Sequence, residues 1–386
     1  MTTDAEALLD GRITDEALAY VRSKVGQFHP VRHWNSAATA DNIWHFALGI
    51  GDDNPLYWDE EHARKSPWGR MVAPPTFFYS FSSGPRRKGD PSTGSTDEFL
   101  PGVLGLWAYD RWHWNRPAYE GEKIHARRGI DKIEEKESKF SGRSVNQVEK
   151  TLFYAENGEE VATCYRNIRR LERAAARSRG KYAEIPPAKY TAEEIRRIND
   201  QYAREPEQRR GAKPRYWDDV KVGEPMITLV KGPLTITSLV GWCMGWGSNM
   251  CPTNRMAYQF MRDFPATKLI DPRTNIEDTQ EAAHWEEYMA QQSGLARGYD
   301  FGGLRISWMA HLMTDWMGDA GFLTDLFVRL TEPVYLGDTL WLTGTVTGRR
   351  RTADAALVDC ELTATNQRGA VVAIAEATAS LPVRLK

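Results

Sequence analysis

One short segment of the sequence, "AAHWEE" at residues 282–287, places a histidine in an acidic stretch, and Asp278 lies six residues before that histidine. A histidine can take up a proton because its unperturbed pKa lies near neutrality, and a carboxylate beside it can hold a water molecule or orient the ring. Such a pair could add water to a substrate or remove it. Taken alone, His284 and Asp278 also fit structural roles, as a surface residue of an amphipathic helix and as its N-cap.

A repeat within the chain connects this segment to one near its start. Residues 56–74 ("LYWDEEHARKSPWGRMVAP") align with residues 283–301 and share tryptophan, acidic, alanine and serine positions. Residues 116–124 and 332–340 then share the pattern Pro-x-Tyr-x-Gly-acid. Each half closes with strand-like runs around a glycine turn, so the same order of elements is expected twice. The alternative is two unrelated α+β domains with chance matches.

Length and composition limit the classes of protein that the chain can represent. The 386 residues suffice for two domains, and 50 basic against 52 acidic residues leave a net charge of -2. This balance predicts no general attraction to nucleic acid or to acidic membranes. No apolar run is long enough for a membrane span, and the first residues lack the features of a secretory signal. Four scattered cysteines without CxxC spacing suggest a reducing, cytoplasmic location and no metal site.

The repeat divides the chain into two halves and a connector. Residues 1–170 are the predicted first half, and residues 215–386 the predicted second half. The stretch between them, residues 171–214, is charged and helix-prone, is broken by a Pro-Pro pair, and offers few apolar positions for burial. It is therefore expected to cross the surface as a connector.

The segment "FALGIGDDNPLYWDEEHA" at residues 46–63 resembles the hydratase loop of the MaoC-like dehydratases, also called (R)-specific enoyl-CoA hydratases. The family pattern is Ala-x-x-x-Gly-Asp-x-Asn-Pro-Ile-His-x-Asp, with a further alanine four residues on. The positions that match are Gly51, Asp52, Asn54, Pro55, Asp59 and Ala63. The resemblance extends over both halves of the chain.

The resemblance implies an α+β fold of two tandem hot-dog domains, each a curved antiparallel sheet wrapped around a central helix. It also implies the reaction, which is the reversible addition of water to a 2-enoyl thioester such as an acyl-CoA. No metal and no redox cofactor are implied. In two-domain relatives of this kind, only one half keeps the catalytic pair.

The resemblance also implies which half is active. Tyr57 occupies the position of the family's catalytic histidine. In the alignment of the two repeats, Tyr57 corresponds to His284. In the second half, Ser248 aligns with Asp52, and an insertion of about thirty residues follows before His284. His284 is therefore the predicted base and Asp278 the predicted acidic partner, although the family spacing between them is five residues rather than six.

A glycine pair lies between this loop and a long apolar helix. Residues 299–319 carry Gly302 and Gly303, followed by an apolar stripe at helical spacing. Free backbone N–H groups in the first turn of a helix can stabilise an oxyanion, so both glycines are predicted to bind the thioester carbonyl. The alternative is a tight turn that needs a positive φ.

The first half lacks the histidine, so its cavity is expected to hold the acyl group. Tyr57, Asp52, Asn54 and Trp285 are the predicted substrate-binding residues. Aromatic residues are frequent near this cavity, which suggests a bulky or cyclic acyl chain. Aromatic core packing is the alternative explanation.

The expected function is thus that of an enoyl-CoA hydratase or dehydratase in fatty-acid or lipid metabolism. Two alternatives remain open: an acyl-CoA thioesterase, and a non-catalytic acyl-CoA-binding subunit of a dehydratase. The expected partner is an acyl-CoA or related thioester, and a homodimer is possible.

Overall fold

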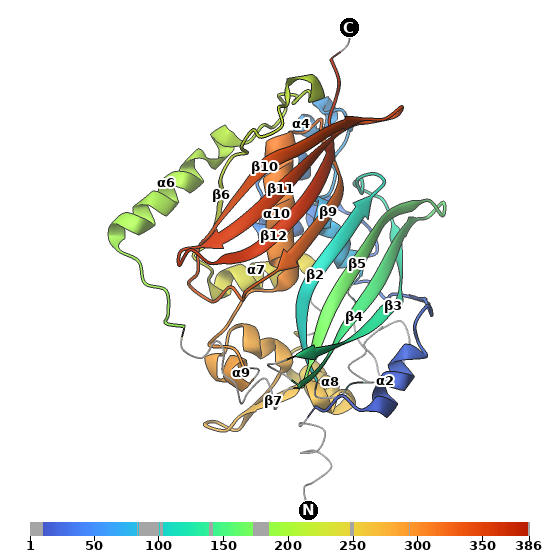
Figure 1. Ribbon diagram of the computed structural model, residues 1–386, viewed down its shortest axis with the longest axis vertical. Coiled ribbons are helices and arrows are strands. Elements are labelled where there is room, and N and C mark those ends of the chain that lie inside the picture. Colours follow the sequence, from blue (N-terminus) through green and yellow to red (C-terminus); the bar gives the residue numbers. More distant parts are fainter. Residues whose placement is uncertain are drawn as a thin grey trace, which may run out of the picture.

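The computed structural model describes residues 11–82, 84, 100, 103–138, 142–172, 185–247, 251–292 and 294–384. The main feature is a ten-stranded sheet in the order β1-β3-β4-β5-β2-β9-β12-β11-β10-β6, in which all named neighbours are antiparallel. In Figure 1 the strands of both halves form one layer, and the helices lie mainly behind it. This arrangement agrees with the α+β class.

The second half wraps its strands around a buried helix, α10 (Gly302–Met317). Every residue of this helix except Gly302 is buried. Most of its residues are apolar, as expected for a helix buried on all sides, but it also buries polar side chains, among them Arg305, His311 and Asp315. The strands are β6 (Leu229–Lys231), β9 (Phe322–Leu330), β10 (Leu340–Arg351), β11 (Ala356–Asn366) and β12 (Val371–Ser380).

The first half has a shorter element at the matching place. Where a central helix is expected, the structure has the 3₁₀ helix η2 (Pro75–Phe81), and most of the residues that follow it lie outside the described part of the chain. Proline occupies the first position of η2, and six of its seven side chains are buried. The strands of this half are β1 (His29–Pro30), β2 (Leu104–Trp114), β3 (Ile124–Ser138), β4 (Gly142–Ala155) and β5 (Glu160–Leu171).

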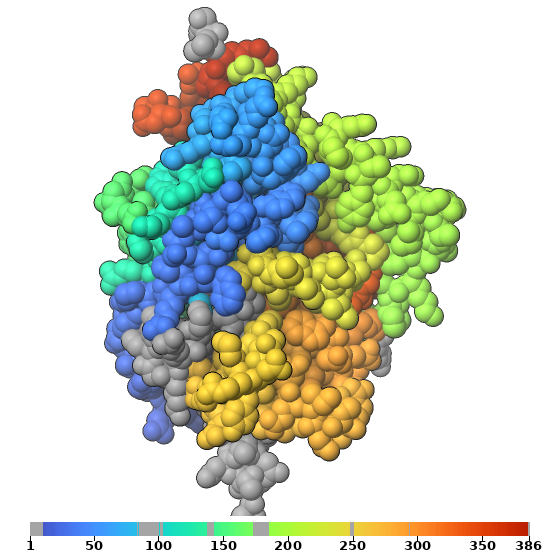
Figure 2. Space-filling view, turned by 180° about the vertical axis from the view of Figure 1, so that it is seen from behind, coloured from blue at the N-terminus to red at the C-terminus, as the bar shows by residue number. Residues whose placement is uncertain are grey.

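Two helices from the two halves cross closely on the face opposite the sheet. They are α3 (Ala40–Ile50) and α7 (Ile236–Trp246), which meet as the blue and yellow regions of Figure 2. A Cβ atom on Gly49 would lie 2.6 Å from the carbonyl oxygen of Gly241, so glycine is required for this backbone contact. The contact helps to join the two halves, and one hydrophobic core runs through both of them.

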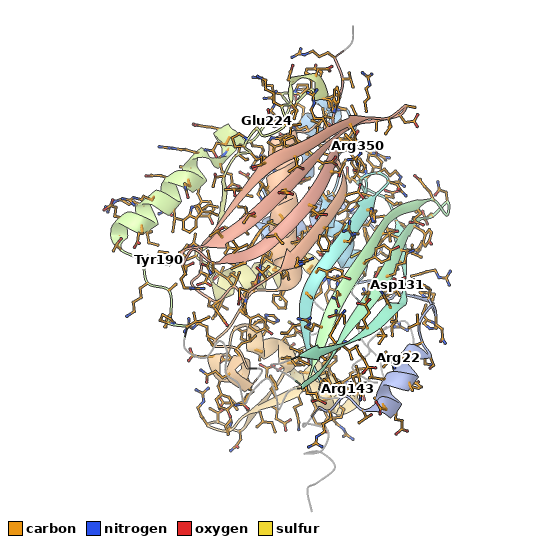
Figure 3. All side chains as sticks on the ribbon, in the orientation of Figure 1. Arg22, Asp131, Arg143, Tyr190, Glu224 and Arg350 are labelled. Carbon is orange, nitrogen blue, oxygen red and sulfur yellow. The ribbon has the colours of Figure 1, made fainter. Side chains whose placement is uncertain are left out.

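The connector contains helix α6 (Ala192–Gln208), which begins with a capping box between Thr191 and Glu194. Tyr190, labelled in Figure 3, ties the start of this helix to the second half by donating to the carbonyl oxygen of Gly337 at 2.7 Å. The connector is therefore fixed to the sheet that follows it.

The remaining elements are short. They are α2 (Asp15–Arg22), η1 (Pro55–Tyr57), α4 (Glu60–Lys65), η5 (Trp217–Asp219), α8 (Asn254–Asp263), η6 (Pro265–Thr267), β7 (Lys268–Asp271), β8 (Ile276–Thr279), η7 (Gln280–His284) and α9 (Glu287–Gln292). Strands β7 and β8 form a separate hairpin just before the predicted catalytic segment. Among the described residues, no helix has the length and apolar character needed to cross a membrane.

Candidate active site

His284 is the last residue of η7, and its ring is held in one orientation. The Nδ1 atom lies 2.9 Å from the carbonyl oxygen of Tyr299. A carbonyl oxygen can only accept, so Nδ1 carries the hydrogen and Nε2 keeps the lone pair. The backbone at Tyr299 therefore selects the tautomer in which Nε2 can act as a base.

Aromatic packing surrounds the imidazole of His284. The ring stacks on Phe301, with centroids 3.7 Å apart, and also contacts the ring of Tyr299. About 13% of the side-chain surface remains exposed, so the ring is largely removed from water but still reachable. Burial disfavours the charged form and lowers the pKa of His284 to about 4. The imidazole is therefore neutral, and able to accept a proton, at neutral pH.

The carboxylate that faces His284 is Glu281. Its Oε2 atom lies 3.7 Å from Nε2 of His284, and its side chain is buried. Asp278 is half-buried on β8, where its Oδ1 accepts a hydrogen bond from the backbone N–H of Thr279 at 2.7 Å. Glu281 is thus the carboxylate that lies within 4.0 Å of the neutral His284 ring, and no such contact between His284 and Asp278 is seen in the described residues.

Sequence reasoning missed Glu281, although a signal was present. The offset that aligns Tyr57 with His284 also aligns Asn54 with Glu281. At the position where the family pattern has asparagine, the second half therefore has a carboxylate. Spacing of three residues lets both side chains lie on one side of a single helical turn. Ser248, the residue aligned with Asp52, lies outside the described residues.

A buried ion pair fixes the backbone that holds His284. Arg305 donates to both carboxylate oxygens of Asp300, at 2.8 and 2.5 Å, and also to the carbonyl oxygens of Glu332 and Val372. Asp300 directly follows Tyr299, whose carbonyl oxygen positions the imidazole. The two-point geometry leaves little freedom in this segment.

Gly302 and Gly303 form the start of α10, directly after Phe301. A Cβ atom on Gly302 would come within 2.7 Å of the Trp107 ring, and one on Gly303 within 3.0 Å of both Trp107 and Trp242. Neither glycine has a positive φ, so the tight-turn alternative does not explain them. The visible reason for glycine is the close approach of two indole rings, and carbonyl binding stays a prediction.

The predicted substrate-binding residues do not all lie at one place. Trp285 directly follows η7 and packs, half-buried, against a small apolar cluster of the second half that includes Ala282 and Ala283. Tyr57 is buried at the end of η1, and burial together with Asp52 raises its pKa well above the ordinary value. Tyr57 therefore stays protonated at neutral pH and has no basic atom comparable with Nε2 of His284.

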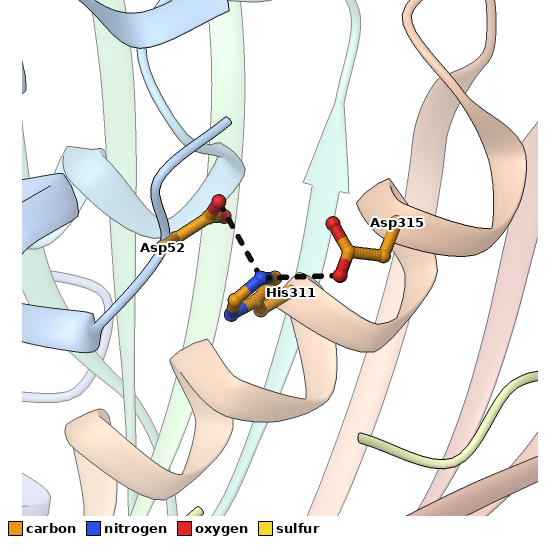
Figure 4. A group of neighbouring side chains, drawn as sticks. All are labelled: Asp52, His311 and Asp315. Carbon is orange, nitrogen blue, oxygen red and sulfur yellow. Dashed lines mark ion pairs between the residues drawn. The ribbon is translucent and has the colours of Figure 1, made fainter. Parts of the chain in front are cut away.

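Asp52 and Asn54 shape the loop around Tyr57. The backbone N–H of Asn54 donates to Oδ1 of Asp52, and the N–H of Leu56 donates to Oδ1 of Asn54, both at 3.0 Å. These are Asx-type turns. Asp52 also faces His311 and Asp315 of α10, two residues that sequence reasoning did not single out (Figure 4).

A pocket of about 500 Å³, counting the part open to solvent, adjoins this loop. Asn54 and Tyr57 line it from the first half, and Thr314 and Asp319 from the second. Thr314 is thirteen residues along the chain from Phe301, which corresponds to about 20 Å of helix. The Tyr57 pocket and the His284 site therefore lie at opposite ends of α10.

Comparison with known sequences supports a dehydratase origin for the first half. Residues 24–164 match the FAS1-like dehydratase domain region. A UPF0336 protein of Parafrankia sp. is 31% identical over 128 residues, which make up 32% of this chain and 78% of that protein. A UPF0336 protein of Streptomyces avermitilis is 28% identical over 125 residues, 32% of this chain and 77% of that protein.

Solved structures share the fold of nearly the whole chain. A MaoC-like dehydratase is similar with a TM-score of 0.63 and 17% identity, over 94% of this chain and 100% of that one. A putative MaoC domain dehydratase of Chloroflexus aurantiacus is similar with a TM-score of 0.57 and 12% identity, over 94% of this chain and 96% of that one. A Mycobacterium tuberculosis protein described as having a double hot-dog fold is similar with a TM-score of 0.55 and 12% identity, over 92% of this chain and 96% of that one.

These matches confirm the expected fold of two tandem hot-dog domains. They also support, in the broad sense, a hydratase or dehydratase activity. With 31% identity over 78% of the Parafrankia protein, the chain belongs with the UPF0336 proteins, and it shares the double hot-dog fold of the MaoC-like dehydratases.

Proposed function

We propose that the protein catalyses the reversible addition of water to a 2-enoyl-CoA and that His284 is the base. The observation that carries this proposal is the state of the imidazole. Nδ1 is occupied by the Tyr299 carbonyl, Nε2 faces a carboxylate, and the pKa is lowered by burial to about 4. At the aligned position of the first half, Tyr57 offers no base.

In the hydration direction, Nε2 of His284 accepts a proton from water while the water oxygen attacks the β-carbon of the enoyl group. The electrons of the double bond move toward the thioester carbonyl, and an acid delivers a proton to the α-carbon. Dehydration is the same sequence in reverse. A positioned acid or base of this kind typically contributes on the order of 10²–10⁴-fold to the rate.

Glu281 is the better candidate for the acidic partner, because its carboxylate lies 3.7 Å from Nε2 and is buried with it. A water molecule held between the two groups would be oriented for attack. Asp278, which the sequence favoured, is the competing candidate, and substituting each residue separately distinguishes them.

The thioester carbonyl needs a partner as it gains negative charge. The first turn of α10 begins next to Phe301, on which His284 stacks, and Phe301 provides no side-chain cap. Backbone N–H groups at Gly302 and Gly303 are therefore suited to this role. Trp107 and Trp242 lie against the same glycines and would limit the shape of the bound acyl group, which favours a flat or cyclic chain.

The test is a panel of linear and cyclic enoyl-CoA thioesters, with hydration followed as loss of enoyl absorbance. Wild-type protein, His284→Ala and His113→Ala are compared. His113 is a suitable control because it lies on β2, half-exposed, and pairs with Asp325 away from η7. Turnover by the wild type and His113→Ala, with none by His284→Ala, supports the proposal.

The same experiment separates the two alternative functions. A thiol reagent in the assay detects free CoA, which a thioesterase would release and a hydratase would not. Binding of enoyl-CoA without consumption of the double bond or release of CoA would indicate a non-catalytic subunit. Either result would overturn the hydratase proposal.

A further inference from the structure

Three side chains that play no part at His284 converge in the interior between the two halves. His311 and Asp315 are four residues apart on α10, so they project from the same face of the helix. Asp52 reaches them from the loop after α3 in the first half (Figure 4). All three are buried, with 2% or less of each residue exposed.

The distances in this cluster are too long for good hydrogen bonds. Nε2 of His311 lies 3.4 Å from Oδ1 of Asp52 and 3.4 Å from Oδ2 of Asp315. An N–H···O bond is typically about 2.7–3.2 Å long. Both ring nitrogens of His311 lack a hydrogen-bond partner among the described residues. The same is true of Oδ2 of Asp315.

The same distances suit ligands of a metal ion. Zinc binds histidine nitrogen and carboxylate oxygen at about 2.0–2.2 Å with tetrahedral geometry. Two ligand atoms at that distance, at the tetrahedral angle, are roughly 3.3–3.6 Å apart. Both separations from Nε2 of His311 fall in this range, and all three ligand atoms lie within 4.8 Å of one another.

The surrounding charges leave room for a cation. Arg209 and Lys231 bring two positive charges, whereas Asp52, Asp315, Glu205 and the more exposed Asp53 bring four negative ones. The excess of two negative charges equals the charge of one divalent ion.

Outer contacts hold the ligands as in known metal sites, where ligating carboxylates are themselves hydrogen-bonded. Arg209 donates through Nε to Oδ1 of Asp315 at 3.0 Å and leaves Oδ2 for the ion. Lys231 donates to the carbonyl oxygen of Gly51 at 2.8 Å, beside Asp52. The Tyr57 pocket, lined by Asn54 and Thr314, includes a chain neighbour of Asp315 and a residue two positions from Asp52.

We propose that Asp52, His311 and Asp315 bind a divalent transition-metal ion, with zinc as the best match to one imidazole and two carboxylates. The group of possible ligands in the described residues consists of these three side chains, and Glu205, whose Oε1 lies 3.7 Å from Nε2 of His311, adds negative charge nearby. The ion joins a loop of the first half to the central helix of the second half. Its role is therefore structural, and it is separate from the chemistry at His284.

A protonated His311 that bridges the two carboxylates is the rival explanation. It would also offset negative charge, but its N–H would have to reach an oxygen 3.4 Å away, and the structure shows no such hydrogen bond in the described residues. The two explanations differ in a direct way. A metal site loses stability with a chelator, whereas a protonated histidine loses it as the pH rises.

The experiment measures metal content by mass spectrometry in tag-free, full-length protein. Wild type is compared with His311→Gln, Asp315→Asn and a control, Asp110→Asn. Asp110 is a matched control because it is a fully buried carboxylate on β2 with hydrogen bonds from Tyr79 and Trp107, and its partners in the described residues do not include the three proposed ligands. Each protein is also melted with chelator and after readdition of Zn²⁺ or Co²⁺.

About one equivalent of metal is expected in wild type and in Asp110→Asn, and less than about a tenth in the other two variants. Chelator should lower the melting temperature of wild type, and Zn²⁺ should restore it. Cobalt-substituted wild type should show the visible absorption of tetrahedral Co²⁺. If a variant does not fold, the chelator and cobalt measurements on wild type still decide the matter.

Three outcomes overturn the proposal. The first is wild type without bound metal and without a response to Zn²⁺ or Co²⁺. The second is equal metal content in His311→Gln, which indicates an adventitious ion only. The third is a chelator-insensitive melting temperature that falls as the pH rises through neutrality, which indicates a protonated His311.

Discussion

The two aligned loops of this protein end in the same local structure but in opposite chemistry. Tyr57 is the last residue of η1 and His284 the last residue of η7, and both helices are short 3₁₀ turns. Burial raises the pKa of Tyr57 and lowers that of His284, so both side chains are neutral at neutral pH. A neutral tyrosine can only give up a proton with difficulty, whereas a neutral histidine can accept one.

The surroundings of the two loops differ as much as the residues themselves. The loop at Tyr57 faces a pocket and a buried charge cluster at the C-terminal end of α10. The loop at His284 faces aromatic rings and the N-terminal end of the same helix. A repeat can therefore keep its fold in both copies while each copy takes a separate task.

The largest effect is expected from His284→Ala. Turnover of an enoyl-CoA should fall at least about 100-fold, because a positioned base contributes on the order of 10²–10⁴-fold. The fold should persist, which circular dichroism checks. If the variant kept more than roughly a tenth of wild-type turnover, His284 would not be the base.

The two candidate acids should separate clearly. Glu281→Gln is expected to lower kcat about 10–100-fold with a smaller change in KM, as for a contact made in the transition state. Asp278→Asn should change kcat less, because its carboxylate bonds to the backbone of Thr279. The reverse order would restore Asp278 as the partner and make Glu281 a structural residue.

The dependence of kcat/KM on pH should lack the usual inflection near pH 6.5. Because burial lowers the pKa of His284 to about 4, the base stays unprotonated and the profile should be flat between pH 5.5 and 7.5. The lowered pKa of His284 also makes the stability of the folded protein depend on pH. The unfolded chain binds the proton more tightly, so the contribution of His284 to stability is complete above its ordinary pKa and is lost as the pH falls toward 4. A fall of kcat/KM on the acidic side with its midpoint near pH 6.5 would contradict the lowered pKa of the buried His284.

Tyr57→His is expected to create no second active site. The sharpest form of this test uses the His284→Ala background, in which any hydration must come from the first half. Tyr57 is surrounded by Asp52, Thr314 and Asp319, and no carboxylate there aligns with Glu281. Recovery of measurable turnover in the double variant would show that the first half keeps a working site.

Asp52→Asn should have the smallest effect on turnover. Asp52 bonds to the loop backbone and faces His311, so its loss is expected to lower the melting temperature, with kcat changed less than about threefold. Thermal melting and steady-state kinetics on the same preparation measure both quantities. A larger loss of kcat than in Glu281→Gln would mean that the active half is the first one.

The sequence was sufficient for the fold, whereas the catalytic role of His284 stays a prediction. Periodic apolar residues, glycine turns and the repeated Pro-x-Tyr-x-Gly-acid pattern are local signals, and they predicted two similar halves. The acidic partner was harder, because the insertion before His284 breaks the family spacing. The structure places the carboxylate of Glu281 3.7 Å from His284, at the position that the repeat aligns with Asn54, and its role as the partner is our proposal.

The buried cluster could not be predicted from local patterns. His311 and Asp315 lie within a stretch that is otherwise an apolar stripe, and Asp52 is more than 250 residues away in the sequence. Arg209 belongs to the charged connector, which composition alone assigns to the surface, yet only 7% of its side chain is exposed. Contacts of this kind depend on tertiary packing, and a 3.6-residue period carries no information about them.

The pairing of β2 with β9 has a consequence for how the chain is made. These two strands join the halves through only five residue pairs, from Tyr109↔Arg329 to His113↔Asp325. β2 ends about 200 residues before β9 begins, which at roughly 5–20 residues per second is about 10–40 s of synthesis. During that time the nascent chain carries an open strand edge, which is a template for pairing with other chains. A ribosome-bound first half should therefore need a chaperone, or slow release, until β9 has emerged to close the edge.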